Sequence, residues 1–253
     1  MVCNQPPTNP HNLRELFLER YSEDWGVYCE GPTAPFFGQK RYVPDSGGSL
    51  ECSIEPGNSP YASIYCYRDL LLMPNATSFS LSFSFWIPPT TCNNAGGVSS
   101  VIQGLEFTFN KFIIDPFSTD PINSPTKRYE FALQYQNVWD GSTGTHGSAW
   151  HYWIPSPDGK SGRWENLSPV FEQCLQGNTW HTFLFEGEIN SSDQVVYKAF
   201  TLDGVIHDLS LLPPQNPTPS NIEGKQVISV QLDSNWNGDP YKLLLNKVNF
   251  IVK

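Results

Sequence analysis

The C-terminal part of the chain, from residue 177 onward, constrains the fold most, because it reads as strands and turns with little between them. Residues 180–186, 194–202, 227–233 and 241–252 are rich in β-branched and aromatic side chains. An Asp-Gly pair that follows such a run is a strong signal for a β-hairpin, and Asp203-Gly204 stands at this position. The sequence therefore predicts an all-β protein built as an antiparallel β-sandwich.

Earlier segments repeat the two-residue period of a half-buried strand. In residues 78–87 apolar side chains alternate with serines until Trp86 takes the serine face, and residues 101–109 and 128–136 alternate in the same way. Residues 13–21 carry the one helix-like pattern. We therefore expect a single jelly-roll domain over residues 1–253, with an N-terminal arm of about 70 residues held by disulfides.

Composition excludes some functions. The 253 residues carry a formal net charge of −10, whereas nucleic-acid binding needs an excess of Lys and Arg. No apolar run is long enough to span a bilayer. The spacing of His and Cys contains no zinc motif, and we expect neither a metal nor a cofactor.

Six cysteines at irregular spacing suit up to three disulfides in an oxidising compartment. We expect the pairs Cys52–Cys66, Cys3–Cys29 and Cys92–Cys174, although six cysteines allow 15 pairings. Three acceptor sequences for N-glycans, at Asn75, Asn166 and Asn190, favour a protein that is secreted or resides in the secretory pathway. The polar, Pro-rich start contains no signal peptide, which suggests a mature chain with an added methionine. A cytosolic protein with buried thiols is the alternative.

A polar groove is the predicted functional site. If the central strands lie in one sheet, their polar faces converge; these faces carry Ser82, Ser84, Trp86, Glu106, Thr108, Glu130, Gln134, Gln136, Ser229, Gln231 and Asp233. A merely solvated face is the alternative, but such faces are usually rich in Lys and Glu, whereas this one is rich in Gln, Ser and Thr. Long loops at residues 137–148 and 156–178 are expected to flank the groove.

Catalytic candidates are few. Glu106, Glu130 and Asp233 are the acids expected on the polar face, but no paired acidic strand motif of a glycoside hydrolase is present. His151 is the better candidate acid or base, with Tyr152 as its partner. Residues 233–239 begin like a calcium loop, but Leu244 occupies the position of the required Glu, so a tight turn explains them as well.

The pattern of the second half resembles the concanavalin-like jelly rolls, a superfold that includes lectins, glucanases and polysaccharide lyases. The resemblance rests on residues 103–107, Trp180-His181, residues 202–204, 230–233 and 247–250. It implies the fold over about residues 78–253 but not one activity, because one superfold hosts many functions. The lyase motifs R-x-E-x-R, Q-I-H and Y-x-K-x-G-x-Y are absent: Ala132 follows where Arg128-Tyr129-Glu130 would continue to an Arg.

The size, the cysteine-bearing N-terminus and a jelly roll without hydrolytic residues also resemble the fungal hetero-Diels–Alderases of tropolone–sesquiterpenoid biosynthesis. That resemblance implies a cofactor-free enzyme that holds two flat or apolar partners in reactive geometry and polarises a carbonyl. The predicted catalytic residues are His151, Tyr152, Gln134 and Glu106. The predicted substrate-binding residues are Trp86, Gln136, Trp150, Trp153, Trp164, Gln231, Asp233 and Trp236.

Three classes of function therefore remain. A cycloaddition catalyst acting on an aromatic or terpenoid small molecule, with dehydration to a quinone methide as an accompanying step, is preferred narrowly. A carbohydrate-binding module or a polysaccharide lyase acting on an oligosaccharide is the alternative, and a structural adhesion domain is the third. A deep apolar pocket would favour the small molecule, whereas an open cleft across the sheet with exposed tryptophans would favour a glycan.

Overall fold

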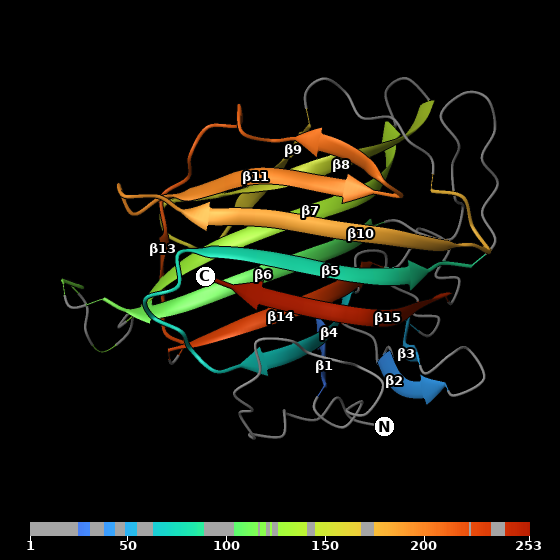
Figure 1. Ribbon diagram of the computed structural model, residues 1–253, viewed down its shortest axis with the longest axis horizontal. Helices are drawn as coiled ribbons and strands as arrows, with labels where there is room; N and C mark the ends of the chain where they lie inside the picture. Colours follow the sequence, from blue (N-terminus) through green and yellow to red (C-terminus); the bar gives the residue numbers. More distant parts are fainter. Residues whose placement is uncertain are drawn as a thin grey trace.

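The structure is a computed structural model that describes residues 25–30, 38–43, 49–54, 63–88, 104–115, 117–119, 122, 126–140, 145–167, 175–222, 224–233 and 241–253. These residues form two antiparallel β-sheets (Figure 1), which confirms the predicted all-β sandwich. Within these ranges no helix is long and apolar enough to cross a membrane. The helix predicted at residues 13–21 lies outside the described residues.

The first sheet, called sheet A, has the strand order β1-β4-β14-β6-β7-β8-β9, with β13 paired to β7. Its strands are β1 (Gly26–Glu30), β4 (Ser63–Leu70), β6 (Gly104–Ile114), β7 (Thr126–Asp140), β8 (Thr145–Pro155), β9 (Gly162–Asn166), β13 (Thr218–Ser220) and β14 (Lys225–Asp233). Strands distant in sequence are thus neighbours, since β14 lies between β4 and β6.

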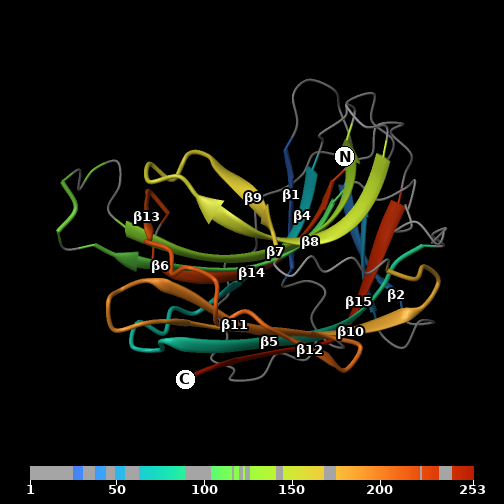
Figure 2. The same ribbon diagram turned by 90° about the horizontal axis from the view of Figure 1, so that it is seen from above.

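The second sheet, called sheet B, has the order β12-β11-β10-β5-β15-β3-β2. Its strands are β2 (Gly38–Val43), β3 (Ser49–Ile54), β5 (Ser78–Trp86), β10 (Trp180–Ile189), β11 (Val195–Leu202), β12 (Val205–Asp208) and β15 (Tyr241–Val252). Figure 2 shows the two sheets as stacked layers, with β8 curving away from sheet B. One face of sheet A is therefore turned away from the core.

The core between the sheets is mainly aromatic. Phe107 of sheet A lies 4.7 Å from the rings of both Phe83 and Phe183 of sheet B, and Phe79 contacts Phe131 at the same separation. Each large aromatic side chain buries much apolar surface. The apolar residues on the inner faces of β5, β6, β7 and β10 therefore stabilise the packing of the two sheets.

Two predictions about the strands were wrong. β5 lies in sheet B, so it does not neighbour β6 or β7, because alternation identifies a strand but not its pairing partners. Both loops expected to flank the groove contain strand: β7 continues to Asp140 and β8 begins at Thr145 within residues 137–148, and β9 lies within residues 156–178.

The turn predicted at Asp203-Gly204 is present between β11 and β12, and both residues have positive φ angles, 50° and 81°. The Asp203 carboxylate stabilises the turn, because it accepts hydrogen bonds from the backbone N–H of Thr182 over 2.8 Å and from Nδ1 of His181 over 2.7 Å. The role of His181 is therefore structural: its side chain supports the turn between β11 and β12.

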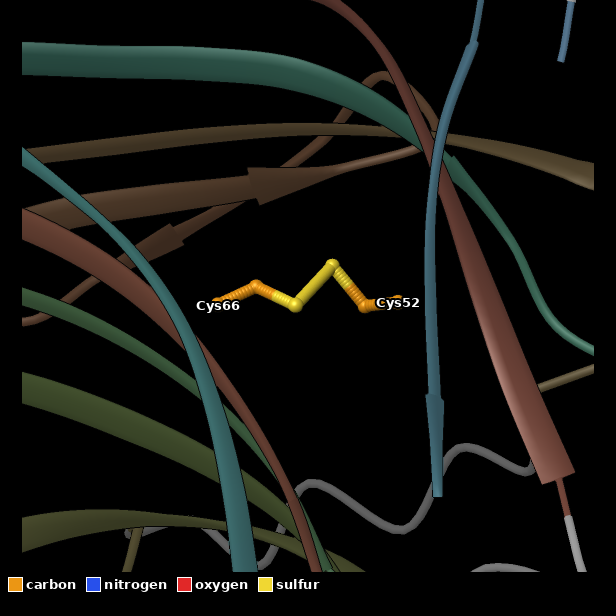
Figure 3. The surroundings of a disulfide bond; sticks show 2 residues. All are labelled: Cys52 and Cys66. Atoms are coloured by element: carbon orange, nitrogen blue, oxygen red, sulfur yellow. A yellow bond between two sulfur atoms is a disulfide. The ribbon is translucent and has the colours of Figure 1, made fainter. Parts of the chain in front are cut away.

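A disulfide connects the two sheets. Cys52 on β3 is bonded to Cys66 on β4, with 6.3 Å between their Cα atoms (Figure 3), which confirms one predicted pair. The other two predicted pairs involve Cys3, Cys92 and Cys174, which lie outside the described residues.

Candidate functional site

A groove of about 990 Å³ crosses the face of sheet A that points away from sheet B. Its lining residues come from β1, β4, β14, β6, β7, β8, β9 and the turn at residues 156–161, so the groove spans the width of the sheet. On β6 the groove residues are Glu106, Thr108, Asn110 and Phe112, while Phe107 and Phe109, which alternate with them, are in the core. The predicted polar face of β6 is thus the floor of the groove.

One transverse row of side chains follows from the strand register. Gln231 of β14 lies opposite Glu106 of β6, which lies opposite Gln134 of β7, which lies opposite His151 of β8. Tyr65 of β4 continues the row beyond Gln231. The row brings together four residues that the sequence predicted for the site.

Asp233 forms a hydrogen-bonded cluster beside this row. Its Oδ1 accepts from Oγ of Ser63 over 2.6 Å and from Nε2 of Gln231 over 2.7 Å, and its Oδ2 accepts from Nε2 of Gln134 over 3.1 Å. Gly104 makes room for the carboxylate, since a Cβ there would lie within 2.4 Å of Oδ2 of Asp233. These bonds fix Gln231 and Gln134 relative to each other.

Glu106 is a buried carboxyl group on the groove floor. Its pKa is raised to about 8: burial has the largest effect and nearby Asp233 and Glu130 act in the same direction, whereas a hydrogen bond from Thr108 and the charge of Arg128 lower the pKa. At neutral pH Glu106 is therefore mainly protonated, so it can donate a hydrogen bond into the groove.

The other charges of the groove are mostly paired. Arg128 donates from Nη2 to Glu130 and from Nε to Oδ1 of Asn110 over 2.9 Å. Lys225 contacts both carboxylate oxygens of Asp69 at 3.0 Å. With Glu106 protonated, the lining carries little net charge.

Trp153 is held as a fixed aromatic surface on the groove wall. Its side chain donates a hydrogen bond to Glu130, and its ring lies 5.0 Å from that of Trp164 at 57°. Gly162 permits this placement, because a Cβ at that position would lie 2.3 Å from the Trp153 ring. The two indoles and the polar floor together offer one apolar and one hydrogen-bonding surface.

Some predicted site residues do not reach the groove. Trp150 is fully buried between the sheets, where it stacks on Phe183 at 5.8 Å, and Tyr152 packs edge-on against Tyr197 on the same side. Because neighbouring residues of a strand point to opposite faces, Tyr152 cannot act with His151 as a pair. Trp86 belongs to sheet B and lies opposite Trp180, away from the groove.

His151 and Gln134 are on the correct face but are buried. Nδ1 of His151 bonds to the carbonyl of Ala149 at 3.1 Å, and burial lowers the pKa of the ring, although bonds to Ala149 and Asn166 act in the opposite direction. The position of Gln136 is in β7 opposite Gly104, but its side chain is not described; Trp236 lies outside the described residues.

Three groove residues of β4 were not predicted from the sequence: Tyr65, Tyr67 and Asp69. The sequence carries a partial signal, because Ile64 and Cys66 alternate with Tyr65 and Tyr67, and the structure buries the first two on the core side. Among the described residues no cluster of three His, Cys, Asp or Glu side chains could hold a metal ion. Most of the possible calcium loop, residues 234–239, falls outside them.

Comparison with known proteins identifies the fold. No protein-family model matches the chain, and no curated protein matches it either. Among solved structures, the carbohydrate recognition domain of Emp47p superposes with a TM-score of 0.51 at 11% identity, covering 94% of this chain and 95% of that one. The alginate lyase Aly36B, in a mutant form bound to an alginate trisaccharide, superposes with a TM-score of 0.50 at 8% identity, covering 94% and 97%. The chain therefore has the concanavalin-like jelly-roll fold, as predicted.

Proposed function

We propose that the protein binds an oligosaccharide segment of a glycan along the groove of sheet A. The observation that carries this proposal is the fixed Trp153–Trp164 pair above a polar floor that crosses the whole sheet. A pyranose ring has an apolar C–H face and a rim of hydroxyls, so it needs an aromatic surface together with positioned donors and acceptors.

The floor supplies both kinds of polar group. The protonated Glu106 can donate and Oε1 of Gln231 can accept, while Asn110 and Ser229 add short polar groups in the adjoining positions. Since Arg128 and Lys225 are already paired with acids, the groove suits neutral or weakly acidic glycans. Recognition rather than cleavage is the proposed role: burial raises the pKa of Tyr67, and His151 is bonded to Ala149, so neither favours proton abstraction.

The cycloaddition remains a prediction that no observation here favours over glycan binding. Of its aromatic walls, Trp150 and Trp86 lie elsewhere, while Trp153 and Trp164 line a groove whose floor carries polar side chains.

The experiment is a titration with neutral gluco-, manno- and galacto-oligosaccharides and with uronate oligomers, followed by tryptophan fluorescence and calorimetry. Trp164→Ala should remove the response, whereas Trp180→Ala should retain it, because Trp180 is an exposed tryptophan on sheet B. A response to flat aromatic or terpenoid ligands with none to any glycan would overturn the proposal.

A further inference from the structure

A second pocket, of about 200 Å³, lies on the other side of sheet A from the groove. Lys111 and Ile113 of β6 line it, whereas their neighbours Asn110 and Phe112 line the groove. The pocket is bounded by residues 74–77 and by the turn between β10 and β11. Each of these segments carries a sequence for N-glycan attachment, at Asn75 and at Asn190.

The walls of the pocket are fixed by hydrogen bonds. Asp193 in the turn accepts from the hydroxyl of Tyr129 over 2.6 Å and from Lys127 over 3.0 Å. The backbone N–H of Ile189 donates to the carbonyl of Thr77 over 2.6 Å, which joins the two segments. A pocket formed in advance binds with a smaller ordering cost.

Lys111 forms the polar end of the pocket. Its ammonium group donates to the carbonyls of Pro74, over 3.0 Å, and of Ala76. An ammonium group has three N–H donors, so one remains beyond these two bonds. The side chain is almost fully buried, so a ligand oxygen at this position would meet a donor shielded from water.

The side chain of Asn190 has a fixed orientation at the edge of the pocket. Its Oδ1 accepts from the backbone N–H groups of Ser192, over 2.9 Å, and Gln194, over 3.0 Å. Its Nδ2 carries two hydrogens, and one of them points to Oε1 of Gln194 at 3.4 Å. Replacing the other hydrogen with a sugar leaves all three contacts in place.

We infer that Asn190 carries an N-linked glycan whose first N-acetylglucosamine sits in this pocket. The attachment forms a bond from Nδ2 to C1 of the sugar, breaks the bond from C1 to the oxygen of a polyprenyl diphosphate donor, and releases the amide proton to that leaving group. Ile113 and Ile189 face the C–H side of the ring, and Lys111 donates to its acetamido or hydroxyl oxygens.

The other two acceptor sequences differ in their surroundings. Asn75 is exposed at a turn closed by the N–H of Ala76 and the carbonyl of Met73, 3.2 Å apart, so a sugar there extends into solvent. Asn166 is exposed on β9 and hydrogen-bonds His151 beside the groove. Asn190, in contrast, lines the pocket described above.

The test compares the full chain secreted from a glycosylating eukaryotic host with the same chain made in a bacterial periplasm. Peptide mass mapping should find Asn190 occupied in the first sample. Ser192→Ala removes the attachment sequence but keeps Asn190, because Ser192 contacts it through the backbone N–H. In the glycosylating host this variant should lower Tm by about 2–4 °C. In the periplasmic protein it should leave Tm unchanged.

An endoglycosidase that leaves the first N-acetylglucosamine should preserve Tm, since that sugar alone occupies the pocket. Asn75→Gln, which removes a solvent-facing sugar, is the matched control and should not change Tm. The inference is overturned if Asn190 is unoccupied, or if it is occupied and the Tm of the glycosylated Ser192→Ala variant equals that of the parent. Neither result bears on glycan binding in the groove.

Discussion

The hydroxyl of Thr108 donates a hydrogen bond to Oε1 of Glu106 over 2.7 Å on the floor of the groove. This bond lowers the pKa of Glu106, but the effect of burial is larger and the pKa is raised to about 8. The same carboxyl group therefore connects the function of the groove to the stability of the fold, because its protonation changes both.

Replacing Glu106 should flatten the dependence of stability on pH. A carboxyl whose pKa is higher in the folded than in the unfolded chain contributes stability fully below pH 4.5, and this contribution is lost as the pH rises to about 8. Urea unfolding of the wild type should lose roughly 2–4 kcal/mol over this interval. Glu106→Gln should lose much less, so that at pH 8 it is more stable than the wild type.

Glu186→Gln is the control, since Glu186 is exposed on β10 of sheet B. It should follow the wild-type curve at every pH. A Glu106→Gln protein with an undiminished pH dependence would mean that Glu106 is ionised at neutral pH in the folded chain.

Gly162→Ala should weaken glycan binding without unfolding the protein. A Cβ at this position would lie 2.3 Å from the Trp153 ring and 2.6 Å from the carbonyl oxygen of Ile154, so the ring must move from its position beside Trp164 and the backbone of β8 and β9 must separate slightly. We expect an affinity loss of about tenfold, or ~1.4 kcal/mol, by calorimetry. Gly224→Ala is the control, because its Cβ would meet mainly the end of the flexible Leu72 side chain. Equal affinity in both variants would show that Trp153 does not contribute to the binding surface.

The faces of the strands could be predicted from the sequence, but their neighbours could not. Alternation placed Glu106, Gln134 and Gln231 on one polar face, and the register of β6, β7 and β14 brings them into one row. The same alternation in β5 carried no information on pairing, so Trp86 was assigned to the groove although it lies in sheet B.

Trp150 and Tyr152 were wrongly predicted to lie in the groove because β8 has aromatic side chains on both faces. Trp150 and Tyr152 alternate with His151 and Trp153, and a period of two does not tell which set meets the core. The choice depends on the opposite sheet, where Phe183 and Tyr197 pack on the first set. The fixed position of Trp153 depends on Gly162, a contact between two strands that local sequence does not report.

Removal of the disulfide should reduce stability while preserving the site. Cys52 and Cys66 are separated by 14 residues and connect the two sheets, so Cys52→Ala/Cys66→Ala should cost about 3 kcal/mol in urea unfolding. Cys66 faces the core, whereas its neighbours Tyr65 and Tyr67 line the groove. Glycan affinity at 25 °C should therefore stay within about twofold of the wild type. A loss of affinity in a folded variant would show that the bond also positions β4.

The charge pairing in the groove predicts how affinity depends on salt. Arg128 is bonded to Glu130 and Lys225 to Asp69, so both cations are already neutralised by groove acids. Lys160, exposed on the turn beside β9, is the remaining cation among the described lining residues. Affinity for neutral oligosaccharides should change less than about twofold between 0.05 and 0.5 M salt, because screening acts on exposed charges. Affinity for uronate oligomers should fall modestly over the same range, and Lys160→Gln should abolish that fall without affecting neutral ligands. A steep salt dependence that survives Lys160→Gln would mean that the ligand displaces Glu130 or Asp69 from its cation, and the groove would then be a site for strongly acidic glycans.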